Sequence, residues 1–138
     1  MKKILLLAVV FVLFNSCSRD DIGSRYNYSY VTLPIDSVDI PSSFTFGSTY
    51  QITLHYKRPS TCHYFYNLYY DKNLNVRTVA VQNVIENRND CQTLTNNEVT
   101  YSFNFLVNSN GGTYVFKFWN GQDANGVDQF LQYTIPVN

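Results

Sequence analysis

The sequence predicts an all-β fold, an antiparallel sandwich of about seven strands. Alternation between apolar and polar residues, the pattern of a half-buried strand, recurs through most of residues 28–138. Aromatic residues make up 17% of the 138 residues, a share typical of strands and contact surfaces rather than of helices. After Cys17 no window of about ten residues has a convincing helical period. The length suits one folded domain, which we expect to span residues 28–138.

The N-terminal residues have the pattern of a secretory signal peptide. Lys2 and Lys3 form a positive start, and an apolar run from Ile4 to Phe14 ends in small and polar residues. At ~1.5 Å per residue a helix of this length crosses only about half of a ~30 Å hydrocarbon layer. We therefore expect residues 1–16 to be removed rather than to form a membrane span.

Ser16 stands directly before Cys17, and Asp20 and Asp21 follow shortly after it. The first feature resembles a lipoprotein signal, and the acidic pair resembles the export signal of Bacteroidota-type surface lipoproteins. The resemblance implies a lipid on Cys17, a flexible tether over residues 17–27 and a lipid-anchored place in the outer membrane, facing the cell surface. The alternative is an ordinary signal peptide that ends near an unrelated cysteine.

The first half of the domain contains four candidate strands. Tyr28–Ile35 is the first, and Tyr50–Lys57 alternates most regularly, as a half-buried strand does. Cys62–Tyr70 is aromatic at both even and odd positions, which predicts a central strand covered on both faces. Leu74–Ile85 is rich in β-branched residues but changes its alternation midway, which predicts a bulge or an edge strand.

The second half contains three more candidate strands. Val99–Val107 alternates regularly, and the segments Tyr114–Trp119 and Phe130–Val137 flank a loop. We expect the last two segments to form a hairpin, because one register keeps every inward residue opposite another inward residue. That register pairs residues 118 with 131, 116 with 133 and 114 with 135.

Asn110–Phe116 resembles the sixth-strand signature D-x-G-x-Y-x-C of immunoglobulin-type domains, with Asn in place of Asp and Phe in place of Cys. The resemblance implies an immunoglobulin-like antiparallel β-sandwich. It also implies that Tyr114 is a corner tyrosine, whose hydroxyl binds upstream backbone. The Phe at position 116 means that the inter-sheet disulfide of antibody domains is absent.

Cys62 and Cys91 remain once Cys17 is assigned to lipid. An even number of cysteines in an oxidising compartment predicts a disulfide between them. A metal pair or a catalytic thiol is the alternative. Neither cysteine lies in a C-x-x-C spacing, and the adjacent His63 would point to the opposite face of a strand.

Several functional classes lack their signatures. Ten basic and ten acidic side chains cancel, which argues against nucleic-acid binding. Hydrolase, metalloprotease and phosphate-loop motifs are missing, so we expect no enzyme and no cofactor. His55 and His63 lack a third zinc ligand, and we expect no metal there. Asp123–Asp128 superficially resembles a calcium loop, with a plain Asn-Gly turn as the alternative.

The predicted hairpin places Trp119 opposite Phe130 on the face turned away from the core. We expect Phe65 and Tyr69 of the neighbouring strand on the same side. Contiguous exposed aromatic residues typically mark contact sites for proteins or sugar rings. The alternative is that Trp119 and Phe130 merely cap the hairpin as a cross-strand pair.

Together these patterns predict a surface-tethered, non-enzymatic binding or assembly module. Its aromatic face would engage a protein partner in the outer membrane. The alternative is a glycan-binding lipoprotein of a nutrient-uptake system, in which tyrosines and a tryptophan stack on sugars.

Overall fold

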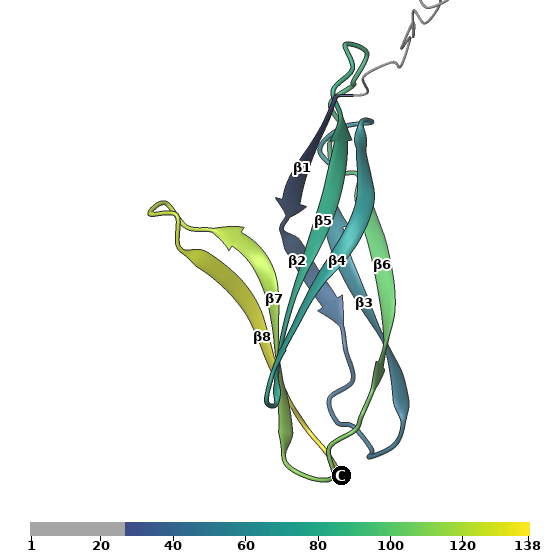
Figure 1. The fold of residues 1–138 in the computed structure, drawn as a ribbon, viewed down its shortest axis with the longest axis vertical. Helices are drawn as coiled ribbons and strands as arrows, with labels where there is room; N and C mark the ends of the chain where they lie inside the picture. The colour runs from purple at the N-terminus through teal and green to yellow at the C-terminus, as the bar shows by residue number, and fades with distance from the viewer. Residues whose placement is uncertain (1–26) are drawn as a thin grey trace, which may run out of the picture.

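The computed structural model describes residues 27–138, which form eight β-strands in two sheets that pack face to face (Figure 1). Within these residues, no helix has the length and apolar character needed to cross a membrane. The strands are β1 (Tyr28–Leu33), β2 (Ile35–Asp39), β3 (Thr49–Lys57), β4 (His63–Asn73), β5 (Val76–Glu86), β6 (Glu98–Leu106), β7 (Thr113–Gln122) and β8 (Asp128–Pro136).

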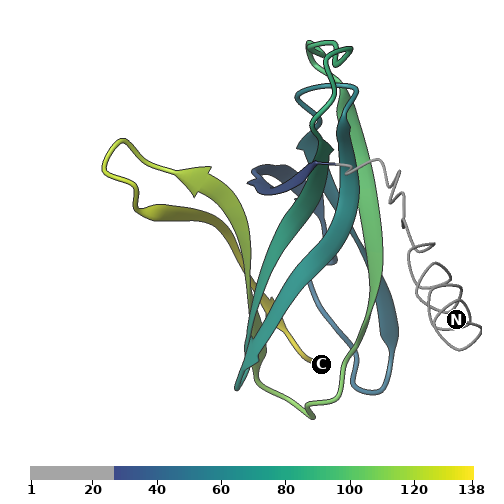
Figure 2. The same cartoon turned by 45° about the horizontal axis from the view of Figure 1, so that its top comes forward.

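The larger sheet has five strands and is organised around β5. Strand β4 runs antiparallel along one side of β5 over its whole length. On the other side β5 pairs first with β7, in parallel from Val76 to Val79, and then with β1, antiparallel from Val81 to Glu86. Strand β8 pairs with β7, and beyond the contact with β5 the β7–β8 hairpin bends away from the rest of the sheet (Figure 2).

The smaller sheet has three antiparallel strands in the order β2-β3-β6. The chain crosses from β1 in one sheet to β2 in the other at Pro34, which lacks a backbone N–H and cannot continue a ladder on both edges. The side-chain amide of Asn120 donates to the carbonyl of Ile35 at 2.8 Å and joins β7 to this crossing. The single strand expected over residues 28–35 is therefore two strands.

Aromatic side chains dominate the core between the sheets. Phe44, from the loop between β2 and β3, lies within ring contact of Phe105, Tyr114 and Phe116. The buried residues of the core are Leu33, Ile35, Phe44, Ile52, Leu54, Tyr56, Val79, Val81, Phe105, Val107, Tyr114, Phe116, Phe118, Ile135 and Val137. Alternate positions of β3 and β7 supply much of this set, as their period-2 patterns predict.

The register expected for the last hairpin is confirmed. Residue 114 pairs with 135, 116 with 133, 118 with 131 and 119 with 130. The hydroxyl of Tyr114 does reach an upstream residue, but it donates to the side-chain oxygen of Asn108 at 2.9 Å rather than to backbone.

Two expectations about the middle strands are wrong. Strand β4, expected to be central, pairs only with β5 within the described residues, and most of its side chains are exposed. Strand β5, expected to carry a bulge or lie at an edge, is the central strand, and the bulge lies in β4 instead. The aromatic residues on both faces of β4 misled the prediction, because tyrosine is equally suited to a buried and to an exposed strand position.

The predicted all-β, two-sheet architecture is confirmed, but the expectation that every strand pair is antiparallel is not. The parallel pairing of β5 with β7 is the exception. It arises because β7, which begins the last hairpin, joins the edge of β5 that β1 leaves free.

Candidate binding surface

The outer faces of the two sheets differ in chemistry. On the three-stranded sheet the side chains that alternate with the buried ones are mostly polar or charged, namely Gln51, Thr53, His55, Lys57, Thr100, Ser102 and Asn104, with Leu106 as an exposed apolar exception. Thr53 and Ser102 hydrogen-bond to each other at 2.9 Å, and His55 and Lys57 contact carboxylates of the same sheet. This face is a mainly polar, solvated surface, and part of its side chains bond to one another.

The outer face of the five-stranded sheet instead presents tyrosines. Tyr28 and Tyr30 of β1 and Tyr64, Tyr66 and Tyr69 of β4 are all exposed, Tyr30 to 64% and Tyr66 to 57%. We call these five residues the tyrosine face. Tyr30 and Tyr64 both lie opposite Val84 of β5, one from each side, so they belong to the same row across the sheet.

A bulge in β4 brings two of these rings together. The register shifts between Phe65 and Asn67, which leaves Tyr66 without a partner on β5. The ring of Tyr66 lies 4.9 Å from that of Tyr30, with 59° between the ring planes. Because β5 separates β1 from β4, the two rings meet above the central strand. A one-residue insertion of this kind redirects a side chain without breaking the sheet.

A shallow depression of about 370 Å³ lies beside these rings, lined by Tyr30, Val31, Thr32, Tyr66 and Gln82. None of these lining residues carries a charge. Gln82 supplies both hydrogen-bond donors and an acceptor, and the hydroxyl of Thr32 can act as either. Neither side chain makes a hydrogen bond within residues 27–138, whereas Tyr30 and Tyr66 supply apolar ring faces.

Of the residues expected to form the aromatic patch, Tyr69 lies on the tyrosine face, 48% exposed. Phe65 does not. Its ring stacks on Tyr101 of the other sheet with 4.1 Å between centroids and 16° between planes, so it closes the edge between the sheets. The bulge at Tyr66 reverses the inward and outward positions of β4, and the strict alternation assumed from the sequence therefore put Phe65 on the wrong side.

Trp119 and Phe130 lie directly opposite each other, as expected, on the hairpin that bends away from the sheet. The indole N–H of Trp119 donates to Asp128 at 3.0 Å. The pairing between β5 and β7 ends at Phe118, one residue before Trp119. The two hairpin aromatics therefore form a group of their own, apart from the rings of β1 and β4.

The sequence pattern missed Tyr28, Tyr30, Tyr64 and Tyr66 as surface residues, although the alternation of β1 offered a signal for the first two.

The hairpin loop after β7 is built as a turn. One carboxylate oxygen of Asp123 accepts the backbone N–H groups of Asn125 and Val127, at 2.8 and 3.0 Å. Asp128 accepts from Trp119 and from Gln122, and these two bonds, the first more strongly, lower the pKa of Asp128. The acidic residues of this loop thus already serve as acceptors for the loop itself.

The two histidines have separate partners. His55 lies between two carboxylates on the outer face of the smaller sheet, 2.9 Å from Asp39 and 3.1 Å from Glu98. The hydrogen bond to Asp39, followed by that to Glu98, raises the pKa of His55. His63 lies 2.7 Å from the hydroxyl of Ser60, and burial, followed by the charge of Arg58, lowers its pKa.

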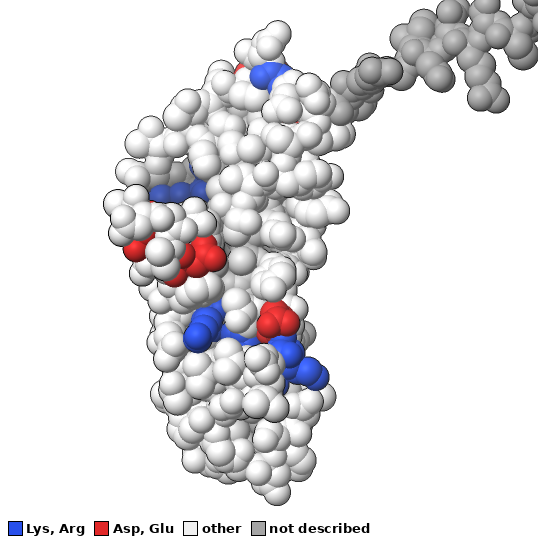
Figure 3. Space-filling view, turned by 60° about the vertical axis from the view of Figure 1, so that its left-hand side comes forward, with Lys and Arg blue, Asp and Glu red and all other residues white. Residues whose placement is uncertain are grey.

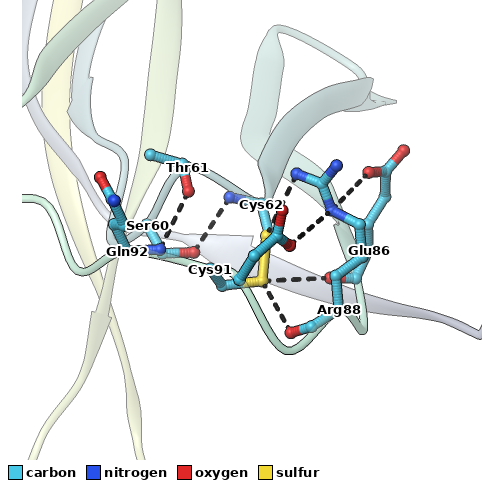
Figure 4. A network of polar contacts seen from close by, with 8 residues as sticks. Ser60, Thr61, Cys62, Glu86, Arg88, Cys91 and Gln92 are labelled. Carbon is cyan, nitrogen blue, oxygen red and sulfur yellow. Dashed lines mark hydrogen bonds and ion pairs between the residues drawn. A yellow bond between two sulfur atoms is a disulfide. The ribbon is translucent and has the colours of Figure 1, made fainter.

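The predicted disulfide between Cys62 and Cys91 is confirmed (Figure 4). It joins the residue before β4 to the loop after β5. Arg88 lies over it and forms ion pairs with Glu86 and Asp90, at 3.3 and 3.4 Å. The first described residue, Asn27, accepts a backbone hydrogen bond from Asn87 in the same loop, so the chain enters the domain at this end. Cys17 and residues 1–16 lie outside the described residues.

No protein-family model matches the chain, and no curated protein or solved structure matches it.

Proposed function

We propose that this chain is a lipid-anchored, non-catalytic binding module of the outer membrane, built on an immunoglobulin-like β-sandwich, whose contact surface is the tyrosine face. The contrast between the two outer faces carries this proposal. One is mainly polar and partly bonded to itself, while the other exposes five tyrosines and an uncharged depression. Aromatic side chains that are exposed next to one another on one face typically mark a contact site, because covering them removes apolar surface from water.

The position of the tyrosine face supports a role at the membrane surface. Tyr28 follows directly on the first described residue, Asn27, at the end where the chain enters the domain. If Cys17 is lipidated, a flexible tether of about ten residues has a typical end-to-end distance of about 20 Å. The face is then held close to the outer leaflet, where a protein partner or a surface glycan would meet it.

The small number of surface charges fits a contact formed by ring faces and neutral hydrogen bonds. On the side of the molecule with the β7–β8 hairpin, Lys, Arg, Asp and Glu form only a few separate groups on a largely uncharged surface (Figure 3). Charged residues are depleted and tyrosine is enriched at the centres of binding interfaces.

Site-specific photocrosslinking on intact cells tests the proposal. A benzophenone amino acid at Tyr66 should give a discrete crosslinked product, because this side chain lies at the centre of the proposed contact. The same amino acid at Gln51, an exposed position on the outer face of the smaller sheet, is the matched control. A crosslinked protein and a crosslinked polysaccharide both support a binding module.

Two results would contradict the proposal. The first is no crosslinked product from Tyr66 at normal expression levels. The second is an identical set of products from Tyr66 and Gln51, since the two faces would then be equivalent. Mass spectrometry of the mature N-terminus separately tests the lipid on Cys17.

A further inference from the structure

We infer that the depression between Tyr30 and Tyr66 binds a neutral saccharide, with one sugar ring seated against the two aromatic rings. The inference rests on the proposed function, because it names the ligand of the same face. It depends on three features of the depression: the geometry of the rings, the polar side chains beside them that have no partner within residues 27–138, and the absence of charge.

The two rings form an open angle rather than a flat stack. With 59° between their planes, Tyr30 and Tyr66 touch at one side and leave their other faces accessible, as their exposures of 64% and 57% indicate. A pyranose ring has one or two faces made of C–H groups, which pack on the electron-rich face of an aromatic ring. The open angle between Tyr30 and Tyr66 therefore allows a pyranose ring to contact both aromatic rings at once.

The polar side chains beside the rings are open to a ligand, because within the described residues they have no protein partner. Thr32 and Gln82 lie opposite each other on β1 and β5, and neither side chain makes a hydrogen bond there. Asn67 of β4 lies opposite Gln82 from the other side and adds a second carboxamide to the row. Hydroxyl and carboxamide groups both donate and accept, which matches a ligand covered with hydroxyls. A few such groups on an otherwise apolar site fix the orientation of a small ligand.

Charge and size restrict the ligand class. None of the lining residues is charged, so nothing in the depression compensates a carboxylate, sulfate or phosphate on the ligand. The volume of about 370 Å³ falls within the range of about 300 to 1,000 Å³ that small-molecule sites occupy. A protein partner would instead cover the whole tyrosine face and has no need of a concave centre.

Affinity electrophoresis of the full-length lipoprotein tests this inference. The native gels contain a neutral polysaccharide, either dextran, mannan, xylan or galactan, or an acidic one, either alginate or polygalacturonate. A detergent without a sugar headgroup is used, since such a headgroup would compete for the site. We expect at least one neutral polysaccharide to retard the protein, and neither acidic one to do so.

Variants then locate the site. Tyr66→Ala should weaken the retarding interaction at least tenfold, and Gln82→Leu should weaken it several-fold by removing the carboxamide. Phe46→Ala removes an aromatic side chain that is 51% exposed but lies outside the tyrosine face, and it should leave the interaction unchanged. Melting temperatures within a few degrees of wild type show that the variants fold.

The outcomes separate the inference from the proposed function. If no neutral polysaccharide retards the protein while Tyr66 crosslinks to a protein, the inference is overturned and the binding module stands. Retardation by acidic polysaccharides alone, or retardation that Tyr66→Ala does not change, also overturns it. If Tyr66 gives no crosslink on cells and no polysaccharide binds, both proposals fail.

Discussion

The guanidinium carbon of Arg77 lies 4.9 Å from the centre of the Tyr114 ring, between the two sheets. Arg77 is only 4% exposed, and one of its terminal nitrogens donates to the carbonyls of Leu74 and Val76, at 2.8 and 2.9 Å. None of the ion pairs found within residues 27–138 includes it. Aromatic rings and backbone carbonyls therefore take the place of a counter-ion.

We predict that Arg77→Lys lowers the free energy of unfolding by about 2 kcal/mol, the size of a desolvated cation–π contact. Lysine keeps the charge but loses the planar group that stacks on the ring and donates to two carbonyls. Urea denaturation measures the change. As a control, Lys57→Ala removes a cation that pairs with Asp36 at 3.5 Å on the surface, and should cost less than about 1 kcal/mol. An equal loss of unfolding free energy in the two variants would mean that the contact of Arg77 with Tyr114 stabilises the fold no more than a surface ion pair does.

Loss of the disulfide should be among the most destabilising changes at the end of the domain where Asn27 meets the loop after β5. Cys62 and Cys91 are separated by 29 positions, and in the chain-entropy model closing such a loop contributes about 3 to 4 kcal/mol. The double variant Cys62→Ala/Cys91→Ala should unfold at correspondingly lower urea concentration. A reducing agent should destabilise the wild-type domain similarly and leave the variant unchanged. A loss below about 1 kcal/mol would show that the loop after β5 is ordered without the covalent link.

The two histidines should titrate on opposite sides of the usual value of 6.5. The carboxylates of Asp39 and Glu98 raise the pKa of His55, whereas burial and Arg58 lower the pKa of His63. With only two histidines in the chain, NMR resolves both imidazole signals, and His55→Gln assigns them. Overlapping titration curves centred near 6.5 would contradict the structure.

The pH dependence of stability follows from the same shifts. A raised pKa in the folded state means that the contribution of His55 is fully present below about pH 6.5 and is lost as pH rises through the folded-state pKa. The lowered pKa of His63 has the opposite effect on stability. Its contribution is present above about pH 6.5 and is lost as pH falls through the folded-state pKa. The stability difference between wild type and His55→Gln should therefore be largest in mildly acidic solution, where a charged imidazole faces ionised carboxylates, and should shrink above neutrality.

Adjacent residues of β7 should respond very differently to the same substitution. Phe118 is fully buried, whereas Trp119 faces outward opposite Phe130. Phe118→Ser should cost more than about 3 kcal/mol, as large-to-small changes in a core do. Trp119→Ser should cost about 1 kcal/mol or less, the size of a cross-strand pair. Thermal melts compare the two variants. If Trp119→Ser were the more destabilised, Trp119 rather than Phe118 would have to pack against the core, which would contradict the structure.

Much of the fold could be predicted from local patterns. Period-2 alternation located the last hairpin and fixed its register, because a shift by one residue would have turned Phe116 and Phe118 out of the core. The cysteine count predicted the disulfide that the structure contains. The partners of His55 could not be predicted in this way, because Asp39 and Glu98 come from two other strands.

What the sequence by itself determined is which segments from β3 onward are strands and which side chains of a regular strand share a face. Only the tertiary structure decided which strand is central, and with it the identity of the exposed surface. Alternation is a local property, whereas the neighbours of β4 and β5 depend on pairings between distant segments. One unpaired residue, Tyr66, is enough to reverse the two faces of β4, so Phe65 packs inward and Tyr66 meets Tyr30 above the sheet.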